Sequence, residues 1–273
     1  MKQSKFLKLL SLGLVLGMCA CGDDDDDPVK GDSDNGKKEQ VDNTVYRYYG
    51  AELYTTQSFM YGRFEAKMKM AYAPGCISSM FLYYNDSYMG NGKRWNEIDI
   101  EVIGKESSGF QTNIITGTAE SQSTSEKMYK LSSNVNEDYH IYVVEWTPEY
   151  VSWSLDGTEV RRDQSNVQVS SLVEKQSLRF NLWASDNSAW VGLLSSKNIP
   201  ITQYIDYVKV SSYDEETKEF TELWTDEFDS FDSSRWSRGN WEMERVTETP
   251  SNVVVEDGVL QLRLTKEPVK TQN

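Results

Sequence analysis

Residues 95–104 read Trp-Asn-Glu-Ile-Asp-Ile-Glu-Val-Ile-Gly, so that acidic and apolar side chains alternate along the stretch. Successive side chains of a β-strand point to opposite faces, which places Glu97, Asp99 and Glu101 together on one face. No basic residue separates these acids, and their mutual repulsion costs stability. The pattern therefore predicts a strand that carries a functional site, the alternative being an acidic strand face of purely structural origin.

Similar alternation recurs from about residue 44 onward, with little helical period. Residues 61–70, 77–84, 177–183 and 204–210 have the pattern of half-buried or buried strands. Two further stretches read as hairpins, 150–160 around Asp-Gly at 156–157 and 253–264 around Asp-Gly at 257–258, because Asp-Gly favours tight β-turns. We therefore expect one all-β domain over residues 44–273, an antiparallel β-sandwich.

Other predicted strands also carry a polar face. Arg179, Asn181 and Trp183 alternate with apolar residues, and Gln111 and Asn113 follow the same rule. If the sheet curves, such faces would line its concave side, while the apolar faces pack against a second sheet. Amides, an arginine, carboxylates and tryptophan suit a carbohydrate, because sugar hydroxyls form hydrogen bonds and apolar sugar faces pack on indole rings.

Composition narrows the chemistry further. The chain of 273 residues has a formal charge of −15, which argues against nucleic acid and polyanionic substrates and suits a neutral one. His140 is the only histidine, so a multi-histidine metal site is excluded and a Ser-His-Asp arrangement would rest on this residue alone. We expect His140 to be structural and acid–base chemistry to fall to carboxylates.

The amino terminus reads as an export signal. Three lysines precede an apolar run that is too short to span a membrane comfortably. Ala20 before Cys21 resembles a bacterial lipobox, in which the cysteine becomes the lipidated first residue; cleavage by signal peptidase I is the alternative. We expect residues 1–20 to be a lipoprotein signal peptide and residues 21–43 to be a lipidated, acidic, flexible tether.

The acidic run from Asp23 to Asp27 resembles the surface-export signal of some Gram-negative lipoproteins. We therefore expect an outer membrane lipoprotein at the cell surface, attached to the membrane only through its N-terminal lipid. Loss of residues 1–20 removes three lysines and no acid, which changes the formal charge from −15 to −18. Cys76 is then the only cysteine besides the lipid anchor, so stability must come from a sizeable core.

Glu-Ile-Asp-Ile-Glu at 97–101 resembles the active-site signature of glycoside hydrolase family 16. Further segments resemble the bacterial 1,3-1,4-β-glucanases (lichenases) of that family, and together they span nearly all of residues 46–265. These segments are Gly50 to Tyr54, Ser78 to Tyr83, Phe110 to Gly117, Glu145 to Pro148 and Arg179 to Trp183. The resemblance implies a jelly roll of the concanavalin A-like type with a concave substrate cleft.

The order of the segments differs from that of most family members, which begin with the kind of segment found here at 224–262. The chain thus resembles circularly permuted lichenases, in which the natural ends are joined and new ends open elsewhere. Such a change is tolerable because sandwich termini often lie close together at the surface.

The family implies an endo-acting, retaining hydrolase that works by double displacement. Glu97 matches the nucleophile, Glu101 the general acid/base, and Asp99 the auxiliary acid that positions the nucleophile and tunes the charge of the pair. Retention requires the two carboxyl groups roughly 5–5.5 Å apart. Residues four apart on a flat strand are about 13 Å apart, so the side chains should lean together. Shared negative charge should raise the pKa of Glu101.

The resemblance also implies substrate contacts and a metal site, although no cofactor for catalysis. The substrate contacts are Trp95, Gln111, Asn113, Arg179, Asn181, Trp183, Trp190 and Trp241, with Glu52, Phe81, Tyr83 and Asn85 as outer ones. Core packing is the alternative for Trp190 and Trp241, and a solvated charge for Glu52. Family members often carry a structural calcium ion, and the matching donors are the carboxylate of Asp206 and the backbone carbonyls of Glu227 and Gly258.

The spacing of the motif favours lichenan and cereal β-glucan as substrates, because many laminarinases insert one residue before its last Glu. A broader β-1,3(4)-glucanase that also cleaves laminarin is the runner-up, and a plant-type xyloglucan transglycosylase fits the lipoprotein signal poorly. A non-catalytic glycan-binding lipoprotein is the alternative from another class, but both catalytic Glu residues are present. We expect a monomer whose partner is β-glucan polysaccharide.

Overall fold

The computed structural model describes residues 44–270. The predicted signal peptide, Cys21 and the predicted tether lie outside these residues. The chain divides into two units after Val45, and the fold below is that of the unit beginning at Tyr46. Within the described part of the chain, no helix is both long and apolar enough to cross a membrane.

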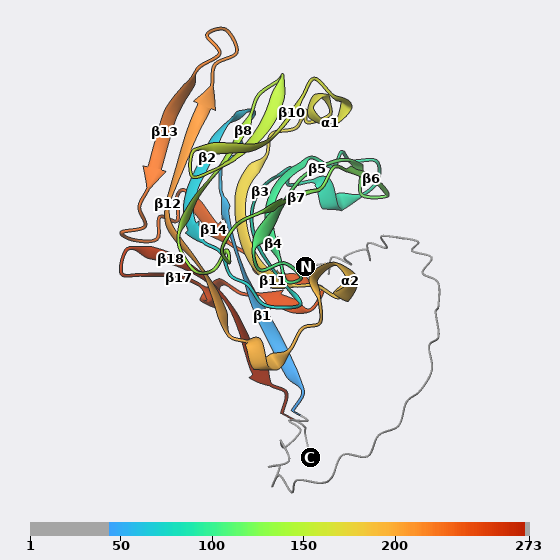
Figure 1. The fold of residues 1–273 in the computed structure, drawn as a ribbon, viewed down its shortest axis with the longest axis vertical. Coiled ribbons are helices and arrows are strands. Elements are labelled where there is room, and N and C mark those ends of the chain that lie inside the picture. Colours follow the sequence, from blue (N-terminus) through green and yellow to red (C-terminus); the bar gives the residue numbers. More distant parts are fainter. Residues whose placement is uncertain (1–43, 271–273) are drawn as a thin grey trace, which may run out of the picture. The chain divides into compact units, whose positions relative to one another are not determined.

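Antiparallel strands make up most of this unit, as predicted, and they form two sheets (Figure 1). Sheet 1 runs in the order β14–β1–β11–β3–β4–β5, and β6 and β7 both pair with β5. Its strands are β1 (Tyr46–Thr55), β3 (Cys76–Tyr83), β4 (Glu97–Ile103), β5 (Gly109–Thr118), β6 (Ser121–Thr124), β7 (Lys127–Lys130), β11 (Ser177–Ala184) and β14 (Trp236–Arg238).

Sheet 2 runs in the order β10–β9–β8–β2–β12 and then divides, with β13 along one half of β12 and β18 followed by β17 along the other. Its strands are β2 (Gly62–Lys69), β8 (His140–Trp146), β9 (Tyr150–Leu155), β10 (Thr158–Gln164), β12 (Ile201–Tyr213), β13 (Phe220–Asp226), β17 (Val253–Glu256) and β18 (Val259–Pro268).

Strand β1 takes part in both sheets. Tyr46 lies opposite Pro268 of β18, whereas Tyr54 lies opposite Arg179 of β11. A short hairpin of β15 (Glu242–Met243) and β16 (Val246–Glu248) adds to β1. The short helices are α1 (Val167–Ser170), α2 (Ser188–Val191), η1 (Ser87–Met89), η2 (Ser196–Asn198) and η3 (Pro250–Asn252).

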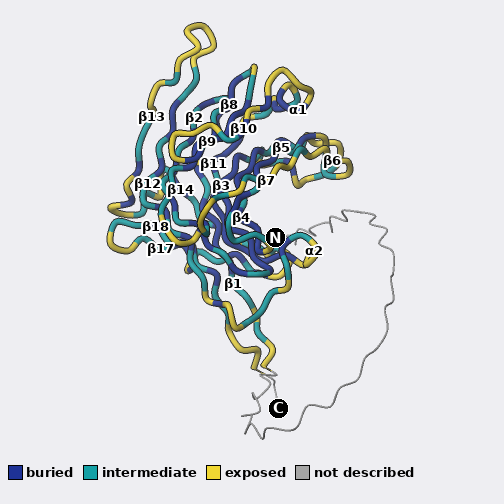
Figure 2. The backbone as a smooth tube through the Cα atoms, viewed as in Figure 1, coloured by how far each residue is buried: buried dark blue, intermediate teal, exposed yellow. Residues whose placement is uncertain are grey.

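The core lies between the two sheets, and exposed residues gather at the hairpin tips (Figure 2). On β4, Ile98, Ile100 and Val102 are at most 1% exposed and belong to this core. Strand β2 alternates buried and half-buried residues along its whole length. Alternation in the sequence thus becomes an apolar interior and a polar exterior, and burial of the apolar faces supplies the main driving force for folding.

The predicted strands are present, with ends displaced by up to four residues. The stretch predicted at 204–210 is longer, because β2, β13 and β18 between them pair with most of β12. His140 opens β8, and its Nδ1 atom lies 2.7 Å from Oδ2 of Asp156 in the turn between β9 and β10. His140 thus lies on a strand and contacts a hairpin turn, which agrees with the structural role that we expected for it.

Candidate active site

Glu97, Asp99 and Glu101 lie on the face of β4 that points away from the core. Strand register places Asn113 of β5 opposite Asp99, and Gln111 opposite Glu101. Because paired residues on neighbouring strands share a face, the acids and the amides belong to one surface. We call this surface of sheet 1, which continues over β3, β11 and β1, the polar face.

Glu97 has hydrogen-bond partners on both sides along the chain, Trp95 and Asp99. The indole Nε1 of Trp95 donates to Oε2 of Glu97 across 2.6 Å. The protonated carboxyl of Asp99 also donates to Glu97. Asp99 is 3% exposed, and its Oδ2 atom has no partner among the described residues. Glu97 and Glu101 are half-buried, so both remain reachable from outside.

Burial raises the pKa of all three acids, but to different extents. The pKa of Glu97 rises to about 7, because hydrogen bonds from Trp95 and Asp99 offset part of the desolvation. That of Glu101 rises to about 8, because repulsion from Glu97 and Glu126 adds to burial. The pKa of Asp99 lies well above its usual range through burial and its two neighbours. Glu97 is therefore the first of the two glutamates to ionise.

Arg179 connects several of the predicted contacts on β1, β3 and β11. Its Nη1 donates to Oε1 of Glu52 (2.6 Å), its Nη2 to Oδ1 of Asn85 (2.8 Å), and its Nε to Oγ of Ser177 (2.8 Å). Glu52 is 3% exposed, so its alternative reading as a solvated charge is wrong. The planar guanidinium thus fixes the carboxylate and the amide in one arrangement.

Aromatic side chains flank the polar face. Trp183 packs against Trp190 with ring centroids 6.2 Å apart, and Nε1 of Trp190 points at Oε1 of Gln111 at 3.4 Å. Trp241 lies 5.9 Å from the ring of Tyr54. Trp190 and Trp241 are half-buried, and Trp190 also packs against the edge of the core. Partly exposed indoles of this kind offer an apolar platform beside hydrogen-bonding groups.

The remaining predicted contacts also reach this face. Phe81 and Tyr83 lie on β3 opposite Asp99 and Glu97. Asn181 is 4% exposed, and Oδ1 of Asn181 accepts a hydrogen bond from Ser79, the residue opposite it on β3. The structure therefore brings every sequence-predicted substrate contact together on or beside the polar face.

Sequence reasoning missed several polar-face residues. Ser79 and Tyr54 occupy the same face as Phe81 and Glu52, two positions away on their strands, so simple alternation could have found them. Glu248 of β16 is fully buried, and neither of its carboxyl oxygens has a partner among the described residues. Burial and the nearby Glu52 raise its pKa well above the usual range. No local pattern distinguishes it from a solvated acid.

The residues predicted for calcium come near one another through strand pairing, since Val208 lies opposite Asp226 and Ile205 opposite Leu260. The carboxylate of Asp206, however, lies 2.7 Å from Nζ of Lys67. No group of three or more acidic, histidine or cysteine side chains suited to a metal occurs within residues 44–270. The other two predicted donors are the backbone oxygens of Glu227 and Gly258, and the calcium site stays a prediction.

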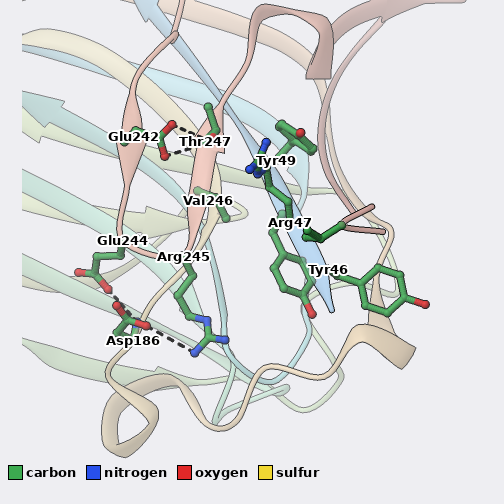
Figure 3. Close-up of a pocket in the computed structure, with 11 residues that line it drawn as sticks. Tyr46, Arg47, Tyr49, Asp186, Glu242, Glu244, Arg245, Val246 and Thr247 are labelled. Carbon is green, nitrogen blue, oxygen red and sulfur yellow. Dashed lines mark hydrogen bonds and ion pairs between the residues drawn. The ribbon is translucent and has the colours of Figure 1, made fainter. Parts of the chain in front are cut away.

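A cavity of about 770 Å³ lies elsewhere, between the first half of β1, the β15–β16 hairpin and Asp186 (Figure 3). Several of its polar side chains interact with one another. Nη1 of Arg245 lies 3.4 Å from Oδ1 of Asp186, and Thr247 donates to Glu242. The three acids of β4 do not line it, so this cavity is distinct from the candidate active site.

Two carboxyl groups with raised pKa values on one strand of an antiparallel β-sandwich are what a glycoside hydrolase of the all-β type would require. The model of Glycosyl hydrolases family 16 matches residues 24–209, and the chain belongs to that family. Strands β13 to β18 lie outside the match yet pair within the same sheets. Circular permutation remains a prediction.

Two relatives illustrate the similarity. The chain is 48% identical over 232 residues to a beta-glucanase of Fibrobacter succinogenes, which covers 83% of this chain and 66% of the relative. It is 31% identical over 163 residues to a beta-glucanase of Brevibacillus brevis, which covers 59% of this chain and 60% of the relative. The chain thus spans somewhat less than two thirds of the length of these relatives.

Solved structures show the same fold. The Crh5 transglycosylase in complex with NAG has a TM-score of 0.52 at 24% identity, covering 61% of this chain and 73% of that one. The laminarinase catalytic domain from Thermotoga maritima has a TM-score of 0.50 at 18% identity, covering 61% and 78%. These similarities confirm the jelly-roll sandwich predicted from the sequence.

Proposed function

We propose that the protein is an endo-acting β-glucanase that cleaves mixed-linkage 1,3-1,4-β-glucan with retention of anomeric configuration. The observation that carries the proposal is the arrangement of Glu97, Asp99 and Glu101 on one strand face, with the pKa of Glu101 above that of Glu97. An ionised nucleophile beside a protonated acid is what the first step of a retaining glycosidase requires.

In the first step, Glu97 attacks the anomeric carbon while Glu101 gives its proton to the departing glycosidic oxygen. The carbon–oxygen bond breaks, and a covalent glycosyl ester forms on Glu97. In the second step, Glu101 takes a proton from water, which attacks the same carbon and frees Glu97. Trp95 and Asp99 hold the Glu97 carboxylate by hydrogen bonds, which orients it and keeps it ionised near neutral pH.

The choice of substrate rests on three supports. The two relatives described above are beta-glucanases. A neutral polysaccharide suits a chain with a formal charge of −15. The partly exposed indoles and the amide groups of the polar face can pack on sugar rings and bond their hydroxyls. The uninterrupted five-residue motif favours mixed-linkage glucan over laminarin.

Reducing-sugar release from barley β-glucan, laminarin and xyloglucan tests the activity. We expect release from barley β-glucan by the wild type and a loss of at least ~10³-fold in Glu97→Ala. Added azide should restore cleavage in Glu97→Ala and give an α-glycosyl azide, and ¹H NMR of the wild-type reaction should show β-products first. Equal, negligible release by both proteins would support a glycan-binding lipoprotein instead.

We also propose that the chain is exported and anchored through lipid on Cys21, on the strength of the sequence signal alone. Cys21→Ser should move the protein from the membrane fraction to the soluble fraction. Protease added to intact cells should digest the wild type if it faces outward. Complete protection would contradict a location at the cell surface.

A further inference from the structure

Arg161 belongs to β10 of sheet 2, but its guanidinium reaches sheet 1. The side chain is 5% exposed and stacks on the ring of Trp153 at 4.4 Å. Its Nη1 donates to the backbone oxygen of Thr112 (2.8 Å), and its Nη2 donates to Oγ of Ser125 (2.9 Å). Asp163 accepts from both Nε and Nη2. A buried arginine with this many bonded donors is a rigid connection between the sheets.

The connection ends on the turn between β6 and β7. Besides its bond to Arg161, Ser125 donates its backbone N–H to Oδ1 of Asn113 across 2.9 Å. On the other side of the turn, Nζ of Lys127 lies 3.4 Å from Oδ1 of Asp163. Both neighbours of Glu126 are therefore fixed, whereas Glu126 itself is exposed.

On β7, Lys127 lies opposite Thr112 and Met128 lies opposite Gln111, so alternation places Glu126 on the same side of the sheet as Gln111 and Asn113, which lie opposite Glu101 and Asp99. The charge of Glu126 acts on Glu101. The other titratable groups that face Glu101 are Glu97 and Asp99 on its own strand. The residues opposite Glu101 on β3 and β5, Ser79 and Gln111, do not titrate. Glu126 is thus the one member of this set that comes from outside β4, and its place depends on the anchored turn.

We propose that Arg161, together with Asp163, is a positioning residue that holds the β6–β7 turn so that Glu126 stays beside Glu101. This inference rests on the proposed function, in which Glu101 is the general acid. The negative charge of Glu126 keeps the proton on Glu101 to a higher pH. A loosened turn lets Glu126 move into solvent, where its charge is screened and its effect on Glu101 fades.

The alkaline limb of kcat/KM on barley β-glucan reports the pH at which the free enzyme loses its essential acid. Glu126→Gln should move this limb to lower pH by about 0.3 to 1 unit, as expected for the loss of one partly solvated like charge nearby. Arg161→Met should move it in the same direction, and the double variant should move it no further than Glu126→Gln alone. Ser125→Ala, which leaves no buried charge unpaired, should give a smaller shift of the same sign.

Glu216→Gln removes an exposed carboxylate in the turn between β12 and β13 and should leave the limb in place. The proposal is overturned if the alkaline limb of Glu126→Gln lies at the wild-type pH. It is also overturned if the limb shifts in Glu126→Gln but not in any folded variant of Arg161 or Ser125. A merely structural Arg161 would lower stability without moving the limb. ¹³C NMR titration of Glu101 reads the same shift without turnover, so the test survives a failure of the proposed function.

Discussion

The indole Nε1 of Trp153 donates to the backbone oxygen of Asp99 across 3.0 Å, so sheet 2 holds the centre of the strand that carries the three acids. Trp153 is fully buried. The bond lies between the two proposed catalytic glutamates, whose spacing sets the outcome of the reaction. This hydrogen bond fixes the position of β4 relative to a bound sugar. Precise positioning of catalytic groups accounts for much of the rate enhancement of enzymes.

Trp153→Phe should lower both stability and rate. It removes an indole N–H and leaves the Asp99 carbonyl without this partner. Trp146→Phe is the matched control, because Trp146 is equally buried but its Nε1 has no partner among the described residues. We expect the free energy of unfolding to fall about 1 kcal/mol further in Trp153→Phe than in Trp146→Phe. Urea denaturation measures this, and a larger loss of kcat should accompany it.

The activity should show a bell-shaped pH profile with its maximum near neutral pH. Glu97 must be ionised, and its pKa is about 7; Glu101 must be protonated, and its pKa is about 8. The acid limb of kcat/KM should therefore follow Glu97 and the alkaline limb Glu101. Initial rates from pH 4 to 10 check this. A maximum below pH 5 would contradict the assigned pKa order and the role of burial.

Glu101→Gln should inactivate the enzyme and stabilise it in alkali. Folding raises the pKa of Glu101 from 4.5 to about 8. Its contribution to stability is thus complete below pH 4.5 and is lost as the pH rises through 8. Relative to the wild type, the variant should gain about 1–3 kcal/mol at pH 8 and almost nothing at pH 4. Chemical denaturation at both pH values measures the difference, and an equal gain at both would count against the linkage.

Arg179→Lys should lower kcat/KM on barley β-glucan by about 10- to 100-fold, because an ammonium cannot reproduce three directed bonds to Glu52, Asn85 and Ser177. Arg263→Lys is the control, since Arg263 pairs with the exposed Glu256 outside the polar face. Rates near the wild-type value for Arg179→Lys would show that a positive charge at this position is enough for activity and that the three directed bonds are not needed.

Glu248→Met should stabilise the protein. The buried carboxyl of Glu248 has no partner, and an apolar side chain of similar size avoids the cost of burying it. Because folding raises the pKa of Glu248, the gain should increase with pH, to about 1–3 kcal/mol at pH 8. Glu52→Met should have the opposite effect, because it leaves the half-buried Arg179 without its carboxylate. Thermal unfolding measures both effects: Tm should rise in Glu248→Met and fall in Glu52→Met.

Alternation along single strands predicted much of this molecule. The hydrophobic effect acts on each strand by itself, so Ile98 and Ile100 had to be buried and Glu97 and Glu101 had to face outward. The family resemblance then supplied roles and contacts that spacing alone would not have given.

Residues that act across the sandwich could not be predicted in this way. No pattern in the sequence distinguishes Arg161 from its exposed neighbour Arg162, and the packing of Trp153 and the carbonyl of Thr112 decide that Arg161 is buried. Glu248 looks like any acid in an acidic chain until β16 pairs with β1 and places it over Gly50. For Asp206, the sequence contained no sign that Lys67 would form an ion pair with it.

The sharing of β1 between the two sheets has a consequence for the order of folding. Its partners are β11, β14, β16 and β18, all of which come much later in the chain. The first strand of the domain thus pairs only with strands that are synthesised much later, and long-range pairing of this kind is slow. Nearly the whole domain is therefore synthesised before all partners of β1 are present. The pairing of β1 in both sheets can therefore be completed only after β18 has been synthesised.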